Sequence, residues 1–409
     1  MLFCGIDIGT SGIRAVVTNQ ADQVQAEASM RFGEMARDPQ AWLNGTVAVM
    51  AQVLQQCSTE ISALAVDGTS GTVLAIDGTG QPVGGPLMYD HRVTDAETLS
   101  ALAALGRSDL AGSAMGRVFH LMRQYPGQRV LHQADWIAGL FTGSFDHTDQ
   151  NNALKSGFDP EHGRWNEAAE ALDLPSVLPR YVREPGAQIG RARGSLAREL
   201  GLSKAMVHAG TTDGCASFLA SGADQVGDGV TVLGSTITLK LLSDTRLEAP
   251  ESGIYSHKLL GHWLAGGASN SGGRVLAAHF DPDAIVRLSH GQSAAPPTGL
   301  DYYPLIEPGE RFPTADPDLM PRLTPRPDDD ARFLKAMFEG MARIEAQAYA
   351  RLAELGGPAL RRVFTAGGGS VNGLWREIRA DTLGLAPQAA LSTEAAFGTA
   401  RLARIGFGV

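Results

Sequence analysis

Cysteine, long apolar runs and an export signal are scarce or missing in this chain, and each absence removes a class of protein. Only three of the 409 residues are cysteine, at positions 4, 57 and 215, and they form no Cys-x-x-Cys pair. This spacing argues against a disulfide framework or a zinc site and predicts free thiols in a reducing compartment. No apolar stretch approaches the ~20 residues that span a bilayer. The first residues read as a strand without a basic leader, so we expect a cytoplasmic protein with no membrane partner.

Positive charge is also in short supply. The chain has 34 lysines and arginines against 44 acidic residues, which gives a formal net charge of -10. A general nucleic-acid binder needs a basic stripe, so we expect no nucleic-acid partner. Any phosphate must instead be bound locally, by backbone N–H groups and a metal ion. The hydrophobic content of 44% and the length predict a globular protein with two domains.

What the chain does have is the same short pattern twice, at residues 6–12 (IDIGTSG) and 232–236 (VLGST). Each copy lies between apolar runs and reads as strand, glycine turn and strand. Glycine lets backbone N–H groups approach an anion, and the hydroxyl residues add donors. One such turn alone is usually an ordinary hairpin, but two at matching places in two halves predict a nucleotide held between them. The expected phosphate contacts are Gly9, Thr10, Ser11 and Gly12 in the first turn, and Gly234, Ser235 and Thr236 in the second.

Two aspartates stand beside these turns in positions that suit phosphate chemistry. Asp7 ends the first strand, two residues before Gly9, and a carboxylate there suits Mg²⁺, which prefers oxygen ligands. Asp7 could instead touch a substrate or only order the turn. Asp213 follows a strand and a Gly-Thr-Thr turn, which predicts a helix N-terminus and a fixed carboxylate that acts as a catalytic base. The alternative is a plain helix cap.

Further glycine turns predict where the adenosine half of a nucleotide binds. The cluster at 367–369 opens a helix, and we expect Gly368, Gly369 and Asn372 to contact the nucleotide. Gly266 and Gly267 read as another glycine turn, which either lines the same cleft or is only structural. A dinucleotide fold is not indicated, because the chain lacks both G-x-G-x-x-G and the acidic residue expected about 20 positions later.

The candidate substrate contacts lie in the first half. Ser70 sits on a tight turn, where an exposed hydroxyl could bind a polyol, and Asp7 and Asp213 belong to the same expected site. Lys155 is a second candidate, although most lysines are solvated surface charges. The roles of Asp90 and Arg92 are open, and a packing role is expected for the Asp-Trp pair at 135–136.

The order of elements predicts an α/β protein. A strand meander over 2–32 precedes a helix over 39–56, and later come a loop-rich region over 281–330, a long helix over 331–355, a strand over 362–366 and a helix over 373–383. A boundary falls near 222–228, immediately before the second phosphate-type hairpin. The predicted domains are therefore residues 1–222 and 223–409.

Several short motifs, in a fixed order across nearly the whole chain, resemble those of the FGGY carbohydrate kinases. They are DIGTS at 7–11, DGTS at 67–70, AGTTDG at 209–214, LGST at 233–236, GLDYYP at 299–304, GER at 309–311 and AGGG at 366–369. Within the family the chain is most similar to the short bacterial and plant D-ribulose kinases, which are xylulose kinase-like. That similarity depends on residues 66–73, 255–258 and 394–400.

The resemblance implies two actin-like (ribonuclease H-like) domains, each with a mixed central sheet flanked by helices, and an ATP cleft between them. It implies sugar binding and the base Asp213 in the first domain, ATP binding in the second, Mg²⁺ as a cofactor, and a monomer or homodimer. The implied reaction is transfer of phosphate from ATP to the terminal hydroxyl of a ketopentose, D-ribulose in particular. The chain departs from the family by being short and by carrying YDHR at 89–92 in place of Trp-x-Asp-x-Arg.

These departures leave D-xylulose and glycerol open as substrates. From other classes, a nicotinamide-dependent polyol dehydrogenase would need the dinucleotide fingerprint that is missing. A non-catalytic sugar or nucleotide sensor would be expected to lose its acidic residues, whereas Asp7 and Asp213 are both present.

Overall fold

The computed structural model describes residues 1–409, which form two compact units. The N-terminal unit consists of Met1–Ala220, Lys258–Leu260 and Glu394–Val409, and the C-terminal unit of Ser221–His257 and Gly261–Thr393. The chain first passes from the N-terminal to the C-terminal unit after Ala220, two residues before the predicted end of the first domain at residue 222. The last segment differs from the prediction, because residues 394–409 return to the N-terminal unit and pack on its sheet.

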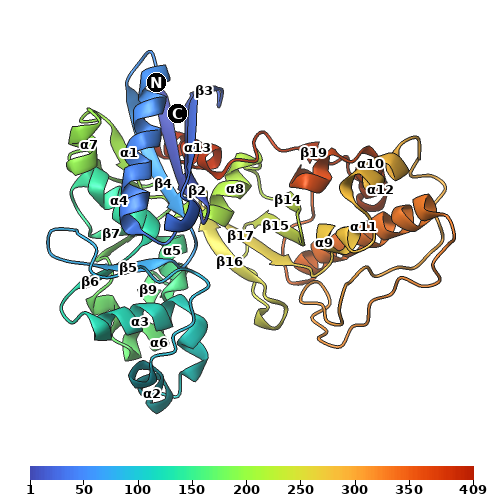
Figure 1. The fold of residues 1–409 in the computed structure, drawn as a ribbon, viewed down its shortest axis with the longest axis horizontal. Helices are drawn as coiled ribbons and strands as arrows, with labels where there is room; N and C mark the ends of the chain where they lie inside the picture. Colours follow the sequence, from blue (N-terminus) through green and yellow to red (C-terminus); the bar gives the residue numbers. More distant parts are fainter. The chain divides into compact units, whose positions relative to one another are not determined.

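The N-terminal unit is built on a mixed sheet in the order β11-β12-β4-β1-β2-β3, with β13 also paired to β4. Figure 1 labels β2, β3 and β4 of this sheet. β1 runs antiparallel to β2 and parallel to β4, and β4 runs parallel to β12 and β13. The predicted meander is therefore confirmed. The strands are β1 (Leu2–Ile8), β2 (Gly12–Asn19), β3 (Val24–Arg31), β4 (Ile61–Gly68), β11 (Gln188–Arg191), β12 (Met206–His208) and β13 (Thr211–Thr212).

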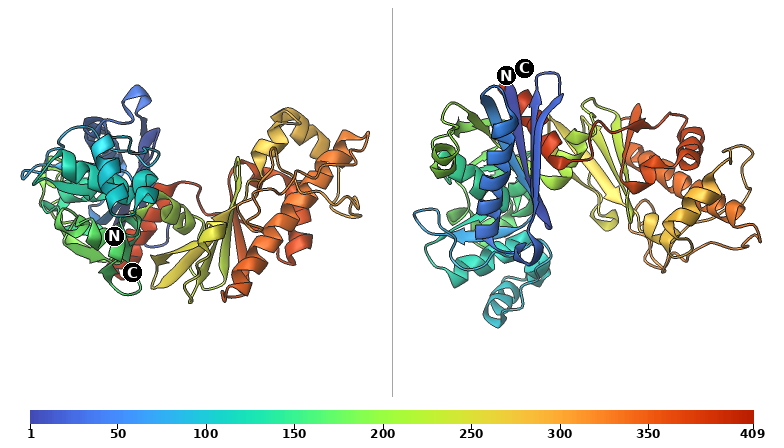
Figure 2. Two further views of the ribbon diagram at one scale, coloured as in Figure 1. Left: turned by 90° about the horizontal axis from the view of Figure 1, so that it is seen from below. Right: turned by 45° about the horizontal axis from the view of Figure 1, so that its top comes forward.

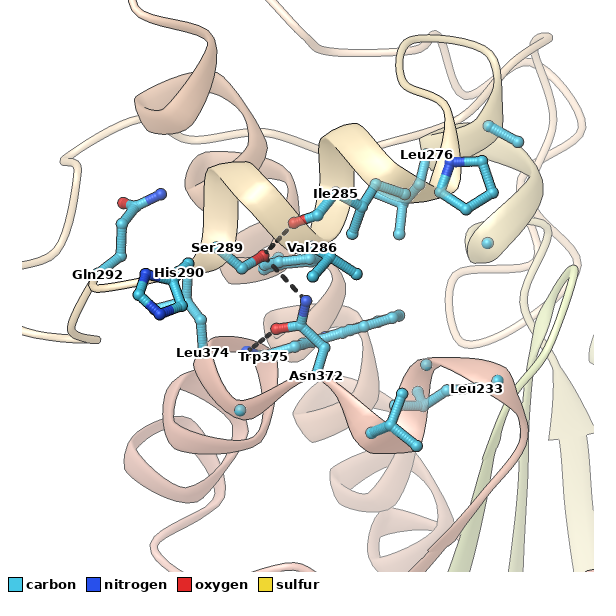
Figure 3. Close-up of a pocket in the computed structure, with 18 of the residues that line it drawn as sticks. Leu233, Leu276, Ile285, Val286, Ser289, His290, Gln292, Asn372, Leu374 and Trp375 are labelled. Carbon is cyan, nitrogen blue, oxygen red and sulfur yellow. Dashed lines mark hydrogen bonds between the residues drawn. The ribbon is translucent and has the colours of Figure 1, made fainter.

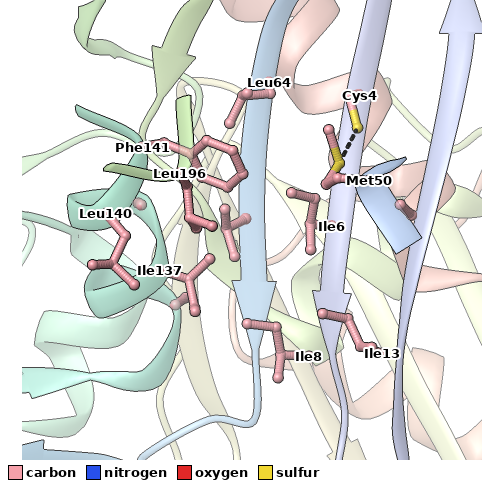
Figure 4. Close-up of a cluster of buried hydrophobic side chains, with 14 of the residues drawn as sticks. Cys4, Ile6, Ile8, Ile13, Met50, Leu64, Ile137, Leu140, Phe141 and Leu196 are labelled. Carbon is pink, nitrogen blue, oxygen red and sulfur yellow. Dashed lines mark hydrogen bonds between the residues drawn. The ribbon is translucent and has the colours of Figure 1, made fainter. Parts of the chain in front are cut away.

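Alternating residues of β1 bury against helices on the two faces of this sheet. Cys4, Ile6 and Ile8 pack with side chains of α1 (Pro39–Gln56) and α4 (Gln133–Thr142), as Figure 4 shows in part. The opposite face is covered by α8 (Asp213–Ala220) and α13 (Ala395–Phe407). At Gly5 a Cβ atom would lie 2.0 Å from the backbone oxygen of Ala396, so only glycine allows α13 to approach so closely.

A smaller helical part of the N-terminal unit surrounds the short antiparallel pair β5–β6. Its core is formed by apolar side chains from the strands and the surrounding helices. The remaining elements of this unit are β5 (Val73–Ile76), α2 (Ala96–Ala104), α3 (Ala114–Gln124), β6 (Arg129–His132), β7 (His147–Asp149), α5 (Gln150–Lys155), β8 (Phe158–Asp159), β9 (Arg164–Trp165), α6 (Glu167–Ala171), β10 (Tyr181–Arg183) and α7 (Ser195–Glu199).

The C-terminal unit repeats the same plan on a second mixed sheet, in the order β16-β17-β15-β14-β18-β19. β14 runs antiparallel to β15 and parallel to β18, just as β1 does with β2 and β4. The long helix α11 and the later α12 pack on this sheet (Figure 2). The elements are β14 (Asp228–Leu233), β15 (Ile237–Ser243), β16 (Tyr255–Leu259), β17 (His262–Ala268), α9 (Gly273–Ala277), α10 (Pro282–Ser289), α11 (Asp330–Glu354), β18 (Arg362–Ala366), α12 (Gly373–Leu383) and β19 (Gln388–Ala389).

The predicted fold class is confirmed: each unit has a mixed sheet flanked by helices. Within the region predicted to be loop-rich, α10 is an ordered helix, while most of the region is irregular as expected. No helix of the chain has both the length and the apolar composition needed to cross a membrane.

Candidate active site

Three carboxyl groups gather at one edge of the N-terminal sheet. In the parallel ladders Asp7 is the partner of Asp67, and Asp67 is the partner of Thr211, which lies two residues before Asp213. Because the carboxyl ends of parallel strands meet at the same edge, the ends of β1, β4 and β13 bring the three aspartates together. The charge of Asp213 raises the pKa of both Asp7 and Asp67.

Asp67 is the deepest of the three and is a site residue that sequence reasoning missed. It is fully buried, and one carboxylate oxygen accepts a hydrogen bond from the Thr399 hydroxyl on α13. Burial, and then the neighbouring Asp7 carboxyl, raise the pKa of Asp67 well above its usual range. The available signal was an acidic residue at the end of an apolar strand, which we used only as part of a family motif.

Asp7 is half-buried, and its pKa is raised to about 6. Burial is the main cause, and the charge of Asp213 adds to it, while a hydrogen bond with Asp67 and the charge of Arg14 act in the opposite direction. A group of carboxyl oxygens that raise one another's pKa is a donor set that a hard divalent cation stabilises. The arrangement therefore suits Mg²⁺, with Asp7 as the candidate ligand.

The turn after Asp7 is a tight glycine turn that joins β1 to β2. The Gly9 N–H donates to the Gly12 carbonyl oxygen at 2.9 Å, and Thr10 and Ser11 at its tip are exposed. Gly12 is required for packing, because a Cβ atom there would lie 2.4 Å from the Met30 carbonyl oxygen.

Asp213 is the first residue of α8, so it lies at a helix N-terminus as predicted. One of its carboxylate oxygens accepts a hydrogen bond from the Gly214 N–H at 2.7 Å. Negative charge is favoured at this end of a helix, and the short bond restricts the side chain. These contacts suit a carboxylate that must be ionised and held in place.

Ser70 lies on the turn after β4, where neighbouring side chains hold the backbone. The Thr69 hydroxyl donates to Gln133 at 2.8 Å and lies 2.7 Å from the Thr72 hydroxyl. Gln133 also accepts from the Thr69 N–H at 3.0 Å. Ser70 takes no part in these bonds and is half-buried. Its hydroxyl is therefore presented on a rigid turn.

The other sequence-based candidates have different surroundings. Lys155 is the last residue of α5, and its charge, after burial and Arg117, contributes to a pKa of about 3 for His132. Asp90 is exposed and forms an ion pair with Arg37 at 2.8 Å, so its carboxylate is already engaged. Trp136 is buried and donates to the Gly80 carbonyl oxygen at 2.9 Å, in agreement with the expected packing role.

A pocket of about 960 Å³ lies within the C-terminal unit, at the ends of β14 and β18 (Figure 3). Several residues predicted to contact a nucleotide line it: Gly234, Ser235, Gly368, Gly369 and Asn372. The first residue of α9 braces the turn at Gly234, since the Gly273 N–H donates to the Gly234 carbonyl oxygen at 2.8 Å. The glycine turns at residues 234–235 and 368–369 therefore border one cavity within the C-terminal unit.

Sequence reasoning missed the wall of this pocket that α10 provides. Ile285, Val286 and Ser289 line the cavity from this helix. The helix had a readable start, because Asp281 caps it by accepting from the Ala284 N–H, and proline occupies its first position. The prolines that follow led us to predict a loop instead.

The prediction of a glycine turn at residues 266–267 is wrong. Gly266 and Gly267 lie inside strand β17 and are not among the residues that line the pocket. A Cβ atom on Gly266 would lie 2.1 Å from the Leu239 carbonyl oxygen, and one on Gly267 would lie 2.7 Å from the Phe312 ring. Glycine is needed there for close packing. Thr236, the last expected phosphate contact of the turn at residues 232–236, is also absent from the pocket lining.

Known proteins share both the sequence pattern and the fold. The N-terminal domain of the FGGY family of carbohydrate kinases matches residues 2–122, and its C-terminal domain matches residues 229–407. The xylulose kinase of Bacillus subtilis is 23% identical over 420 residues, covering 92% of this chain and 82% of its own. The autoinducer-2 kinase of Yersinia enterocolitica is 25% identical over 460 residues, covering 99% and 86%.

A solved structure supports the same fold. The xylulose kinase from Rhodospirillum rubrum superposes with a TM-score of 0.83 at 24% sequence identity, covering 100% of this chain and 90% of that one. At this identity the likeness concerns the fold alone. The matches to both domain models show that the chain belongs to the FGGY family of carbohydrate kinases and is a sugar kinase, for which ATP is the substrate that the family implies.

Proposed function

We propose that the chain transfers the γ-phosphate of ATP to the terminal hydroxyl of D-ribulose, giving D-ribulose 5-phosphate. The observation that carries this proposal is the meeting of three strand ends in the N-terminal unit, which places Asp7 and Asp213 at one sheet edge. Ser70 follows the end of one of these strands by two residues. A carboxylate and a hydroxyl on rigid elements are groups that bind and orient a polyol.

In this proposal Asp213 is the catalytic base. It accepts the proton of the sugar hydroxyl as that oxygen attacks the γ-phosphorus, and the bond from phosphorus to the bridging oxygen of ADP breaks. Phosphoryl transfer depends more on positioning than on a strong base, so an aspartate is adequate. The hydrogen bond from Gly214 to Asp213 restricts the carboxylate in the way that such positioning requires.

Asp7 would hold Mg²⁺, which when bound offsets negative charge on the phosphates of the nucleotide. The exposed turn residues Thr10 and Ser11 would donate to the phosphates. In the C-terminal unit the backbone of Gly234 and Ser235 would do the same, and the adenosine half would occupy the pocket beyond them. Asn372 would border that half of the nucleotide.

D-xylulose is the second candidate sugar, because several relatives are xylulose kinases. D-ribulose is preferred because residues 66–73, with Ser70 among them, resemble the short D-ribulose kinases. A coupled ADP-release screen over D-ribulose, D-xylulose, aldopentoses and glycerol decides between them. A higher kcat/KM for D-xylulose than for D-ribulose would correct the sugar, and no turnover with any polyol would reject the kinase proposal. The oligomeric state, a monomer or homodimer, and the cytoplasmic location stay predictions.

Asp213→Asn tests the assignment of the base. The amide keeps the shape of the side chain but cannot accept the proton, so we expect kcat to fall by at least about 10³-fold. Binding of ATP, measured by calorimetry, should stay within about twofold, because the pocket in the other unit is unchanged. Turnover close to that of the unchanged enzyme would show that another group is the base.

A further inference from the structure

Exposed apolar side chains border the nucleotide pocket of the C-terminal unit. Val371 is 88% exposed and Val286 is 68% exposed, the highest values among the large apolar residues of the chain. Both line the pocket, Val371 from the turn that opens toward α12 and Val286 from α10. Apolar groups left in water around a cavity indicate a surface that a ligand covers.

Two polar side chains on this wall, Asn372 and Ser289, are engaged with the protein itself. Asn372 accepts from the Trp375 N–H at 3.0 Å and donates from Nδ2 to the Ser289 hydroxyl at 2.9 Å (Figure 3). The Ser289 hydroxyl in turn donates to the Ile285 carbonyl oxygen at 2.7 Å. These bonds cap α12 and tie it to α10, so both side chains have a structural task.

Gln292, at one end of the pocket, is held in the same way. Its Nε2 donates to the carbonyl oxygens of Leu288, at 2.5 Å, and Ala331, at 3.1 Å. Both partners can only accept, so they fix the orientation of the amide. The hydrogens of this amide are therefore spent on the backbone and are not free to read the edge of a base.

We infer that this pocket holds the nucleobase mainly by apolar contact with Val286 and Val371, and that the kinase accepts purine nucleotides in general, GTP and ITP as well as ATP. The second hydrogen on Asn372 Nδ2 suits a ring-nitrogen acceptor, which adenine, guanine and hypoxanthine all carry. A site built to hydrogen-bond one substituent rejects an analogue by about 10⁴-fold, whereas an apolar pocket discriminates far less. This inference rests on the proposed function for its identification of the pocket.

Calorimetric titration of the full chain with ADP, GDP and IDP, with Mg²⁺ present, tests the inference by binding alone. We expect the three dissociation constants to agree within about tenfold, because the pocket contacts the face of the base. Binding of ADP more than about 100-fold tighter than that of GDP or IDP would overturn the inference. The absence of binding by all three nucleotides would also overturn it. Turnover with the matching triphosphates is measured separately. Binding of all three diphosphates without turnover would reject the proposed phosphoryl transfer. It would leave the inference of broad purine binding unchanged.

Variants locate the binding. Val286→Asp and Val371→Asp should each weaken all three nucleotides in parallel, by about tenfold or more, because a charge replaces apolar contact. Met320→Asp is the matched control, since Met320 is 65% exposed in the same unit but does not line the pocket. Gln292→Ala should change the three constants equally. A selective loss of ADP binding in that variant would show that Gln292 reads adenine and would contradict the inference.

Discussion

The turn over residues 69–72 contains two threonine hydroxyls with a structural task and one serine hydroxyl without such a task. We expect Ser70→Ala to raise the KM for the sugar by about three- to tenfold, because one hydrogen bond contributes roughly 0.5 to 1.5 kcal/mol. The KM for ATP should not change. Steady-state kinetics with each substrate varied in turn measures both. Ser62→Ala, at the other end of β4, is the control, and an unchanged sugar KM in Ser70→Ala would remove this residue from the site.

A second pair of buried carboxyls links the smaller elements of the N-terminal unit. Asp135 on α4 and Asp149, which caps α5, line a small cavity together with His147. Burial raises the pKa of Asp149 to about 6, although hydrogen bonds from Asn151 and Asn152 lower it. Burial and the charge of Asp149 raise the pKa of Asp135 well above its usual range. Asp149 is therefore mostly ionised at neutral pH, while Asp135 keeps its proton to a higher pH than an ordinary aspartate does.

This difference gives stability a pH dependence whose sign can be worked out. In the unfolded chain Asp135 loses its proton near pH 4, but in the folded protein it keeps the proton to higher pH. The unfolded state then binds fewer protons, so the free energy of unfolding falls as pH rises above about 4, by at most about 1.4 kcal/mol per pH unit.

Asp135→Asn removes that titration. We expect the variant to gain stability relative to the unchanged protein as the pH rises above about 4, measured by urea denaturation at a series of pH values. The exposed Asp318→Asn is the control and should show a constant difference. If the difference between Asp135→Asn and the unchanged protein does not grow with pH, Asp135 is ionised in the folded state.

At the scale of elements, one buried ion pair fastens two helices and two strands of the C-terminal unit. Arg379 on α12 donates to Glu345 on α11 through two nitrogens, at 2.6 and 2.7 Å, and both side chains are 1% exposed. Arg379 also donates to Thr365 on β18, and Glu345 accepts from Thr231 on β14. This network contacts β14 and β18, the strands that precede the glycine turns at residues 234–235 and 367–369.

Arg379→Met should destabilise the protein by about 3 to 5 kcal/mol, because it leaves the Glu345 carboxylate buried without its partner. Adding Glu345→Leu to that variant should recover much of the loss, since both charges are then gone. Urea denaturation of the single and double variants measures this, with the exposed Arg376→Met on the same helix as control. A loss below about 1 kcal/mol in Arg379→Met would mean that the glutamate finds another partner.

Elements fixed by local signals could be predicted from the sequence. α1 begins at Pro39 behind a capping aspartate, and α12 begins behind Asn372 and ends just before Gly384, so the predicted ranges agree with the structure. The two glycine turns were also predicted correctly, because each lies between apolar strands. In each case the deciding residues lie within a few positions of one another.

Features set by long-range packing could not be predicted. Asp67 gains its importance from Asp7 and from Thr399, which is 332 positions away in the sequence. Gly266 looked like a turn residue, but its task is to let β17 approach Leu239. A sequence pattern shows that a glycine or an aspartate is present, and only the fold shows what faces it.

At the scale of the whole molecule, the chain uses one plan twice. In each unit the first strand pairs antiparallel with the next and parallel with a later strand, and a glycine turn follows the first strand. The two turns differ in chemistry: Asp7 precedes the turn in the N-terminal unit, while Val232 holds the matching position in the other. The cluster of Asp7, Asp67 and Asp213 therefore lies in the N-terminal unit, and the pocket of about 960 Å³ lies in the C-terminal unit.

Helix α13 completes the N-terminal unit, so the proposed sugar site depends on residues far away in the sequence. α13 covers β1 and β4, Thr399 donates to Asp67, and Arg401 and Arg404 pair with Asp22. At Gly398 a Cβ atom would lie 1.9 Å from the Ala216 carbonyl oxygen, so α13 packs on α8 at backbone distance.

Gly398→Val should therefore separate the two units functionally. Because the added side chain cannot fit against α8, we expect loss of sugar phosphorylation and a lower unfolding midpoint for the N-terminal unit. ADP binding to the C-terminal unit, measured by calorimetry, should persist within about threefold, since its pocket contains no residue of α13. Ile405→Ala, at a partly exposed position of the same helix, is the control and should retain both activities. Equal loss of sugar turnover and ADP binding in Gly398→Val would show that the C-terminal unit does not fold independently of α13.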